Sequence, residues 1–377
     1  MDGPLSGLRV LALAGKGPAP FACMLLADMG ADVVRVIKPS EANTGQGTPY
    51  SPPPDLDVVN RGTQSIVVDL KSPAGVEQIR RLASRADVFI EGFRPGVIER
   101  LGLEPDVLLE GNPHLVVARL TGYGQDGAMA RLPGHDINYL AESGALHLLG
   151  SADSPPLPPL NLIGDYGGGA VAALGIVAAV LYARAAGVGQ VVDAAITDSI
   201  GILTSKIHGL RAAGLVDDAR GTSFLAGAAP FYGVYECGDG RYLAVGAIEP
   251  QFYEVFLKGL GFEAATAPDW SDRAQWPRLR AAIAAIVATR PLEDWLQVYE
   301  GTEACVSPVL TFNEATALRR NQSRRLYVEM DGVLHPEPAP RFSSTPSRRP
   351  SPTTRAPGAD AVVERWSARR GAAVDDV

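Results

Sequence analysis

The sequence predicts an α/β protein with a Rossmann-like, open parallel sheet in its first part and a smaller α+β domain after it. Residues 9–37 follow the pattern strand, helix, strand, which implies two parallel strands joined by a crossover helix. A further strand, helix and strand over residues 66–91 extend that sheet. From about residue 231 the pattern changes to a hairpin followed by helices.

The elements of the first part follow from short local signals. Residues 9–14 and 31–37 are apolar runs typical of buried strands, and the helix between them is expected over residues 21–29, with Gly30 suited to end it. A loop is expected over residues 40–58 and a third strand over 66–70. The next helix, residues 73–86, has Ser72 as its N-cap and Pro73 at its first position, and residues 87–91 form the fourth strand. Ligands of such sheets bind beyond the carboxyl ends of the strands.

The later part of the chain divides further. Residues 231–235 and 241–245 are expected to pair as a hairpin across the turn 237–240, and helices are expected to follow to about residue 300. We predict a large domain over residues 1–200, a small domain over residues 225–315 and a C-terminal segment over residues 316–377. The tail after Glu337 is rich in proline, serine and arginine, which favours an extended or partly disordered segment.

Composition narrows the functional classes. The 377 residues are 46% apolar and carry a net charge of −8, so nonspecific nucleic-acid binding is not expected. The chain has three cysteines, Cys23, Cys237 and Cys305, at spacings that do not suit a metal site. They predict buried thiols in a reducing, cytoplasmic compartment, with no bound metal.

Residues 166–183 form a stretch without a charged side chain that is about as long as a membrane span. The stretch is rich in glycine and alanine, and no second stretch of this kind exists in the sequence. We therefore predict a fully buried helix whose small residues let another backbone approach closely, rather than membrane insertion.

Three polar residues each precede an apolar, helix-like run: His135 in residues 134–139 (GHDINY), Asp165 in 161–169 (NLIGDYGGG) and Glu249 in 245–253 (VGAIEPQFY). A helix start would favour neutral His135, a base with a reference pKa of about 6.5. Asp165 is equally explained as an N-cap, and its reference pKa of about 3.9 suits proton donation only if burial raises it. Glu249 is equally explained as a helix-start carboxylate before Pro250. A base, an acid and fixed N–H donors suit removal and return of a proton beside a carbonyl.

These segments closely resemble the alpha-methylacyl-CoA racemases, within the family III CoA-transferase (CaiB/BaiF) superfamily. The resemblance runs from residue 4 to about residue 311 and includes residues 4–10 (PLSGLRV), 24–36 (MLLADMGADVVRV), 91–96 (EGFRPG) and 301–309 (GTEACVSPV). It implies that the C-terminal segment returns to the large domain, and that two chains interlock as a homodimer with the active site between the large domain of one and the small domain of the other.

The resemblance also implies roles for individual residues. His135 and Asp165 match the two acid/base residues of the racemases, and Asp165 equally matches the nucleophilic aspartate of the transferases. Glu249 would orient His135 across the subunit interface. The residues matched to CoA binding are Lys38, Arg61, Lys71, Arg94, Arg100, Gly134, Asp136 and Tyr139. Arginine suits this work because its planar guanidinium binds phosphate through paired hydrogen bonds.

The sequence departs from the family pattern at several positions. Two basic residues expected after Asn60 and Arg61 are replaced by Thr63 and Gln64, and the family's Leu-Asp-Gly-Gly motif appears as residues 225–228 (LAGA). We expect CoA recognition to depend more than usual on Arg94 and Arg100, and we expect basic residues at positions 63 and 64 to tighten CoA binding.

The function expected from the resemblance is racemisation of 2-methylacyl-CoA thioesters through an enolate, without a cofactor, since acyl-CoA is the substrate. One alternative is a CoA transferase in which Asp165 attacks the thioester. A second alternative is an altered protein that binds acyl thioesters or epimerises a specialised acyl group, which the lost basic residues favour. The intact set of His135, Asp165 and Glu249 opposes loss of catalysis.

Overall fold

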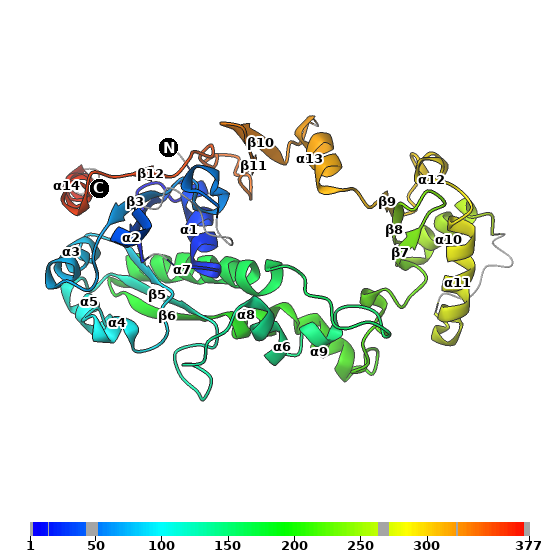
Figure 1. Cartoon of the computed structure of the whole chain (residues 1–377), viewed down its shortest axis with the longest axis horizontal. Coiled ribbons are helices and arrows are strands. Elements are labelled where there is room, and N and C mark those ends of the chain that lie inside the picture. Colours follow the sequence, from blue (N-terminus) through cyan, green and yellow to red (C-terminus); the bar gives the residue numbers. More distant parts are fainter. Residues whose placement is uncertain (1–2, 14, 43–51, 263–270, 322, 373–377) are drawn as a thin grey trace. The chain divides into compact units, whose positions relative to one another are not determined.

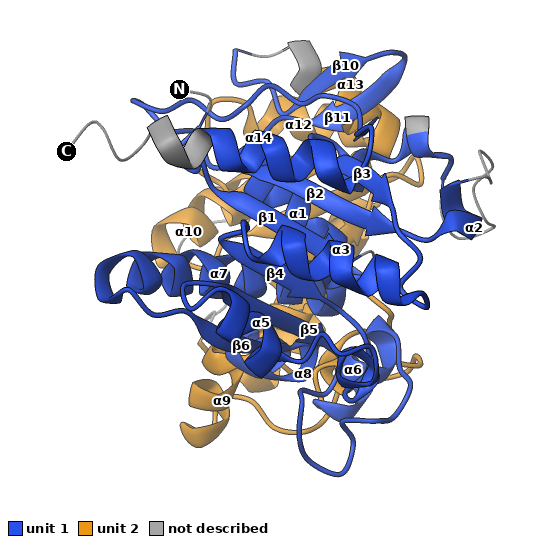
Figure 2. Ribbon diagram, turned by 90° about the vertical axis from the view of Figure 1, so that its left-hand side faces the viewer, with its two compact units in different colours: residues 1–143, 160–203, 322–377 blue, residues 144–159, 204–321 orange. Residues whose placement is uncertain are grey.

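The computed structural model describes residues 3–13, 15–42, 52–262, 271–321 and 323–372 (Figure 1). It divides into two compact units, which Figure 2 distinguishes by colour. The large unit comprises residues 1–143, 160–203 and 322–377, and the second unit comprises residues 144–159 and 204–321. The second unit therefore starts with a short segment, residues 144–159, that sequence patterns had placed in the large domain.

The large unit is built on a seven-stranded sheet in which each described pair of neighbouring strands is parallel. The strand order is β12-β3-β2-β1-β4-β5-β6. The strands are β1 (Arg9–Leu13), β2 (Asp32–Ile37), β3 (Gln64–Val67), β4 (Val88–Glu91), β5 (Val116–Thr121), β6 (Gln190–Ala195) and β12 (Thr354–Arg355). The open parallel sheet is thus confirmed. The chain leaves β1 first toward β2 and later toward β4, so the strand order reverses at β1, where such sheets bind ligands.

Helices cover both faces of this sheet, because each face carries its own apolar cluster. One cluster packs α1 and α7 against side chains such as Val10 of β1 and Ile90 of β4. The other packs α3 and α14 against Leu11 and Phe89. The helices of this unit are α1 (Pro18–Asp28), α2 (Pro39–Ala42), α3 (Pro73–Ala83), α4 (Val97–Arg100), α5 (Pro105–Gly111), α6 (Asp136–Glu142), α7 (Gly167–Ala186), α8 (Ile196–Leu203) and α14 (Ala359–Ala372).

Several predicted element boundaries are confirmed or corrected by these bounds. The α1 helix begins at Pro18 rather than at residue 21, because the proline fits the first helical position. The α3 helix begins as predicted, with the Ser72 side chain accepting the backbone N–H of Gly75 at 3.0 Å, but it ends three residues earlier than expected. The predicted loop at 40–58 overlaps three short helical turns, α2, Pro54–Leu56 and Val58–Asn60, and it includes residues 43–51, which lie outside those described.

The C-terminal segment ends in structure that the sequence pattern did not predict. β12 adds a seventh strand beside β3, with Thr354 in register with Gln64. Helix α14 then packs on α3, and its Val362 and Trp366 are fully buried. A hairpin of β10 (Tyr327–Met330) and β11 (Val333–Pro336) precedes them.

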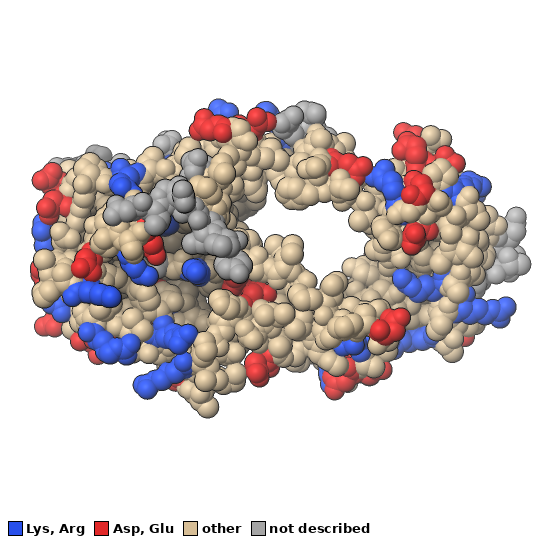
Figure 3. Space-filling view, in the orientation of Figure 1, with Lys and Arg blue, Asp and Glu red and all other residues tan. Residues whose placement is uncertain are grey.

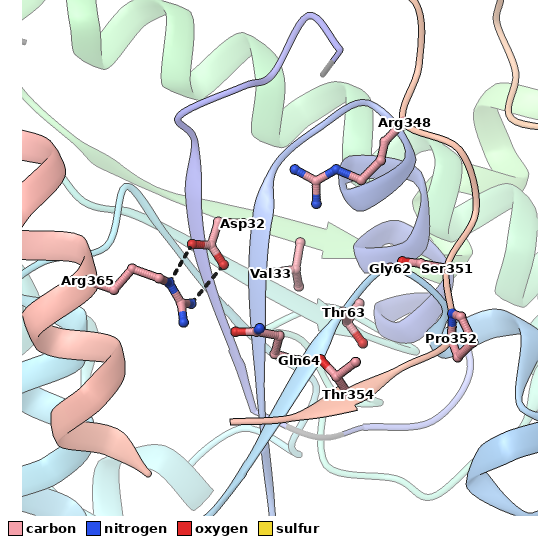
Figure 4. A pocket seen from close by; sticks show the side chains of 10 residues that line it. All are labelled: Asp32, Val33, Gly62, Thr63, Gln64, Arg348, Ser351, Pro352, Thr354 and Arg365. Atoms are coloured by element: carbon pink, nitrogen blue, oxygen red, sulfur yellow. Dashed lines mark hydrogen bonds and ion pairs between the residues drawn. The ribbon is translucent and has the colours of Figure 1, made fainter. Parts of the chain in front are cut away.

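A cavity of about 250 Å³ lies at the amino ends of β2 and β3, where this C-terminal segment crosses the sheet (Figure 4). Asp32 and Arg365 form a two-bonded ion pair at its wall, with Nε and Nη2 at 3.2 and 3.0 Å from the carboxylate oxygens. The indole Nε1 of Trp366 donates to the same carboxylate at 3.0 Å. These contacts attach α14 to the amino edge of the sheet, which is the edge opposite the one that binds ligands in such folds.

The second unit has a three-stranded antiparallel sheet, ordered β7-β8-β9, covered by helices. The predicted hairpin is confirmed as β7 and β8, with Tyr232 paired with Gly246. The elements are α9 (Ser205–Ala212), β7 (Tyr232–Glu236), β8 (Tyr242–Gly246), α10 (Pro250–Gly259), α11 (Trp276–Val287), α12 (Leu292–Tyr299), β9 (Val306–Pro308) and α13 (Phe312–Asn321). Cys305, just before β9, is exposed and has φ 50°, so the prediction that all three thiols are buried is wrong for it.

The apolar helix predicted at 166–183 is present, but it is not fully buried within this chain. Residues 162–186 form a continuous helical segment long and apolar enough to cross a membrane, with 39% of its most apolar window buried. On its inner side the small residues do permit close approach, since a Cβ at Gly169 would lie 2.7 Å from the Pro18 carbonyl oxygen of α1. On its outer side Leu174 and Leu181 are 71% and 70% exposed. The expectation of complete burial within one chain is therefore wrong.

Candidate active site

A cavity of about 680 Å³ opens in the large unit at the carboxyl ends of β1, β4 and β5. This is the edge, and the point of reversed strand order, at which open parallel sheets bind their ligands. Its walls are the loops that follow these three strands, the start of α6 and the turn before α7. The predicted site residues that line it are Arg94, Gly134, His135, Tyr139 and Asp165.

His135 immediately precedes α6 and is exposed to this cavity. Its backbone N–H donates to the Asn138 side-chain oxygen at 3.0 Å, and this bond holds the start of α6 without involving the imidazole ring. Tyr139 fixes the approach to the helix, because its hydroxyl donates to the Gly134 carbonyl at 2.6 Å. A Cβ at Gly122 would come within 2.1 Å of the Tyr139 ring, so only glycine permits this packing. The apolar run after His135 predicts a helix over residues 136–149, but the helix ends at Glu142.

Asp165 lies in a π-helical turn, η4 (Leu162–Tyr166), that runs directly into α7. The Tyr166 N–H bonds to the Asn161 carbonyl five residues earlier, as a π turn requires. The alternative explanation of Asp165 as an N-cap is therefore wrong, since the helical segment has already begun before it. Such turns are frequent at functional sites.

The Asp165 carboxyl is half-buried and its pKa is shifted upward. Desolvation by burial is the largest cause of the raised pKa, and the Asp136 carboxylate is the second, while the Asn161 side chain and His135 act in the opposite direction. Gly17 lies against this carboxyl, since a Cβ at that position would be 2.8 Å from Oδ1. A raised pKa suits a carboxyl that must donate a proton near neutral pH.

Two cations line the cavity, and only one of them was predicted. Arg94 follows β4, within residues 92–95 of the cavity wall, and is exposed. Lys16 lies in the turn between β1 and α1, beside Gly17, and was missed. Its signal in the sequence was its position directly after the first predicted strand, between two glycines, at the edge of the sheet where ligands bind.

Lys71 and Arg100 are brought together, but in a separate cavity of about 340 Å³ beside α3 and α4. Arg80 lines the same cavity, where its guanidinium donates to the Gly102 carbonyl at 2.8 Å. Figure 3 shows basic side chains gathered over this part of the large unit. The cavity is suited to an anionic group, in contrast to the net negative charge of the whole chain.

Lys38 and Arg61 lie at neither cavity. Lys38 is exposed and forms an ion pair with Glu41 at 3.6 Å. Arg61 is only 2% exposed, and its guanidinium bonds to Asp28 at 2.6 Å and to the Pro336 carbonyl at 2.6 Å. In this structure the Arg61 side chain links α1 to the C-terminal segment and lines neither cavity. Asp136 is also buried, away from the cavity lining.

The two positions that lack the family's basic residues lie at the opposite edge of the sheet. Thr63 and Gln64 are at the amino end of β3, and both line the cavity of Figure 4. Thr63 is 1% exposed, and its hydroxyl accepts from the guanidinium of Arg35 at 2.9 Å. The expectation that basic residues here would tighten CoA binding stays a prediction. A lysine at position 63 would bury a second cation beside Arg35 and destabilise the fold.

Glu249 belongs to the second unit, where it is the exposed residue before Pro250 and α10. Pro250 occupies the first helical position, as predicted. The contact of Glu249 with His135 of another subunit stays a prediction. Among the described residues, no group of three or more His, Cys, Asp or Glu side chains could hold a metal ion.

Comparison with known proteins assigns this chain to a family. The model of CoA-transferase family III matches residues 5–360. The chain belongs to CoA-transferase family III. It is 43% identical over 345 residues to the alpha-methylacyl-CoA racemase of Mus musculus, an alignment that covers 91% of this chain and 87% of the relative. It is 30% identical over 374 residues to the succinate–glutarate CoA-transferase of Agrobacterium fabrum, covering 93% and 92% of the two chains.

Solved structures of CaiB/BaiF family proteins share this fold. A CaiB/BaiF family protein from Brucella suis superimposes with a TM-score of 0.78 at 26% identity, covering 98% of this chain and 99% of that one. The agreement over nearly the whole length indicates that the family fold extends to the C-terminal β12 and α14.

Proposed function

We propose that this family III protein is an isomerase that racemises 2-methylacyl-CoA thioesters. The observation that carries the proposal is that one cavity, at the carboxyl edge of the sheet, is lined by both His135 and Asp165. The 43% identity to an alpha-methylacyl-CoA racemase supports it. The cations Lys16 and Arg94 at the same cavity suit an anionic substrate such as acyl-CoA.

The chemistry requires two groups that exchange one proton with the α-carbon from opposite faces. His135 removes the α-proton as a neutral base while protonated Asp165 delivers a proton to the other face, and the reverse direction exchanges these roles. The C–H bond breaks to give an enolate, and the thioester bond stays intact. The first N–H groups of a helix have no partner within it, and those of α6, next to His135, are the donors that we propose for the enolate oxygen.

The test of this function is incubation of the purified protein with a 2-methylacyl-CoA in D₂O. We expect deuterium at the α-carbon and inversion of configuration, without release of free CoA. Transfer of CoA to an added free acid would instead identify a transferase, and binding without either reaction would identify an acyl-thioester binding protein.

The transferase is the second candidate, and the position of Asp165 favours keeping it. Its carboxyl is accessible from the cavity, and a nucleophilic aspartate is what the family's transferases use. In that reaction Asp165 would attack the thioester carbonyl, forming a mixed anhydride as the CoA thiolate leaves. A second base at His135 has no use in that mechanism, which is why we place racemisation first.

We expect Arg100 and Lys71 to bind the phosphates of CoA. Replacing Arg100 with alanine removes a charge-assisted hydrogen bond worth roughly 1.5–3 kcal/mol, so acyl-CoA binding should weaken about ten- to a hundredfold. A pantetheine thioester, which lacks the nucleotide, should bind equally to both forms. Isothermal titration with both ligands measures this, with Arg85→Ala as a control because Arg85 is an exposed cation outside the cavity. Equal losses for both ligands would contradict phosphate recognition.

We also propose that the protein is a homodimer, because the apolar outer side of α7 is left uncovered in a single chain. Leu174 and Leu181 are seven residues apart, so they lie on one side of the helix, and contiguous exposed apolar surface marks an interaction site. Replacing both with glutamate should convert the dimer to monomer in sedimentation velocity, whereas replacing both with methionine should not. A wild-type protein that is monomeric at micromolar concentration would contradict the proposal and the role of Glu249.

A further inference from the structure

Asp136 adjoins both His135 and Asp165, the two residues that would exchange the proton. It follows His135 in sequence and begins α6, yet its carboxylate oxygen Oδ1 accepts the backbone N–H of Asp165 at 2.7 Å. One side chain therefore connects the start of α6 to the π turn that holds Asp165. This link spans 29 residues of sequence and is the only described side-chain hydrogen bond to the Asp165 backbone.

The surroundings of this carboxylate are unusually close and carry no compensating charge. Asp136 is 8% exposed, and a Cβ at Gly164 would lie 2.4 Å from its Oδ1, so the contact requires glycine there. The other oxygen, Oδ2, is buried and has no hydrogen-bond partner in the described part of the chain. No described lysine, arginine or histidine forms an ion pair with it. A buried carboxylate without a cation lowers the stability of the fold, so the presence of Asp136 next to Asp165 suggests a functional role.

We propose that Asp136 is a positioning residue, which holds Asp165 at the cavity through its hydrogen bond and keeps a proton on Asp165 through its charge. The inference rests on the proposed function, because it concerns the same proton exchange. The Asp136 side chain touches the backbone of Asp165 rather than the substrate cavity, so this side chain acts through Asp165.

The charges around Asp165 support this assignment. From the start of α6 it is faced by His135, Asp136 and Tyr139. Burial is the largest cause of the raised pKa of Tyr139, and the charge of Asp165 adds to it. Lys16, in the turn before α1, also lines the cavity. Ile196 of α8 lines it as well and is uncharged. Asp136 is the charged neighbour that raises the pKa of Asp165, after burial itself.

The direction of the effect on activity follows from these charges. The productive enzyme carries one proton shared between His135 and Asp165, so its activity falls at low pH when both are protonated. Removing the charge of Asp136 lowers the pKa of Asp165, because the carboxylate form is no longer opposed by a neighbouring negative charge. The acidic limb of the pH–rate profile must then move to lower pH.

The experiment compares Asp136→Asn, Asp136→Ala and Asp193→Asn with the wild-type protein. Asparagine keeps an oxygen that can accept the Asp165 N–H but removes the charge, whereas alanine removes both. Asp193 is the matched control, because its exposed carboxylate also accepts a backbone N–H, that of Gln125 at 2.9 Å, away from the cavity. Two quantities are measured: kcat/KM for α-deuterium exchange as a function of pH, and the carbon-13 NMR titration of the Asp165 carboxyl, assigned with Asp165→Asn.

We expect Asp136→Asn to lower the NMR titration midpoint of Asp165 and to move the acidic limb of kcat/KM to lower pH. Asp136→Ala should in addition lower kcat/KM at neutral pH by about ten- to a hundredfold, the effect of losing one hydrogen bond to a charged group. Asp193→Asn should leave both quantities unchanged. An Asp165 midpoint that does not fall in Asp136→Asn would overturn the inference. Absence of exchange in the wild-type protein would overturn the proposed function instead, while the NMR titration would still decide the role of Asp136.

Discussion

Alanine at position 135 or 165 is expected to reduce α-proton exchange by about 10²–10⁴-fold, because each residue supplies one half of a general acid–base pair. His135 and Asp165 line the same cavity, and the proposed mechanism assigns them to opposite faces of the α-carbon, so neither should replace the other. The measurement is deuterium incorporation at the α-carbon of a 2-methylacyl-CoA. His208→Ala is the matched control, because His208 is an exposed histidine on α9, outside the cavity.

The loss should be catalytic rather than structural. The His135 side chain is exposed, and the helix start keeps two bonds that do not use the ring, from the His135 N–H to the Asn138 side chain at 3.0 Å and from the Asn138 N–H to the His135 carbonyl at 2.8 Å. For Asp165 the sign of the stability change depends on pH. Its pKa is raised in the folded protein, so the folded state pays for ionising it, and Asp165→Asn should stabilise the protein at neutral pH. That gain should vanish once the pH falls below the carboxyl's ordinary pKa, where Asp165 is protonated in both states.

Thermal denaturation of Asp165→Asn at neutral and acidic pH tests the sign. A variant that keeps near-full exchange would refute the two-base assignment, and a variant that is unfolded at both pH values would contradict the stability argument. Transfer of CoA to a free acid that is lost in Asp165→Ala but kept in His135→Ala would favour the transferase mechanism.

Replacing Arg119 with methionine is expected to lower the free energy of unfolding by about 3–5 kcal/mol, the usual cost of leaving a buried charge without its partner. The Arg119 guanidinium on β5 lies between two carboxylates, with Glu91 at 2.7 Å and Glu99 at 2.8 Å. Glu91 is 0% exposed, and burial raises its pKa while Arg119 opposes that rise. Without Arg119, Glu91 must take up a proton, so the loss of stability should grow with pH.

The same substitution should also impair the cavity. The second oxygen of Glu91 accepts the Phe93 N–H at 2.8 Å, and the loop that it holds carries Arg94 into the cavity wall. Urea denaturation measures the stability, with Arg81→Met as the control. Arg81 pairs with Asp360 at the surface, with side chains 50% and 71% exposed, so its loss should cost less than about 1 kcal/mol. A loss for Arg119→Met no larger than for Arg81→Met would contradict the buried-pair argument.

Local signals predicted the elements that depend on local sequence. Ser72 and Pro73 marked the start of α3 correctly, and the alternation over residues 231–245 marked the hairpin, because caps and turns are determined by neighbouring residues. The strand β12 was missed because a two-residue strand is visible only through its pairing with Gln64, nearly 300 residues away in sequence. Helix α14 was missed because the whole tail after Glu337 was judged by the proline, serine and arginine that dominate the part before this helix.

The same distinction explains the site. His135 and Asp165 were identifiable because each stands at the start of a helical run with recognisable neighbours. Arg61 was not interpretable in the same way, because its partner Asp28 and the Pro336 carbonyl come from distant segments. Likewise, no sequence pattern shows that Thr63 lies at the amino edge of the sheet. That position follows only from the direction and pairing of β3 with its neighbouring strands.

The return of the C-terminal segment has a consequence for how this chain folds as it is synthesised. Val362 and Trp366 of α14 belong to the same buried cluster as Leu11 and Phe89, so the first strand and the last helix share one core. The amino-terminal strands therefore emerge from the ribosome long before the residues that complete their packing. A nascent chain holding them exposes apolar surface until α14 has left the ribosome, and such surface promotes aggregation. Emergence of α14, rather than emergence of the sheet, should be the event after which the large unit becomes resistant to protease, and removal of the α14 helix should leave a product that depends on chaperones.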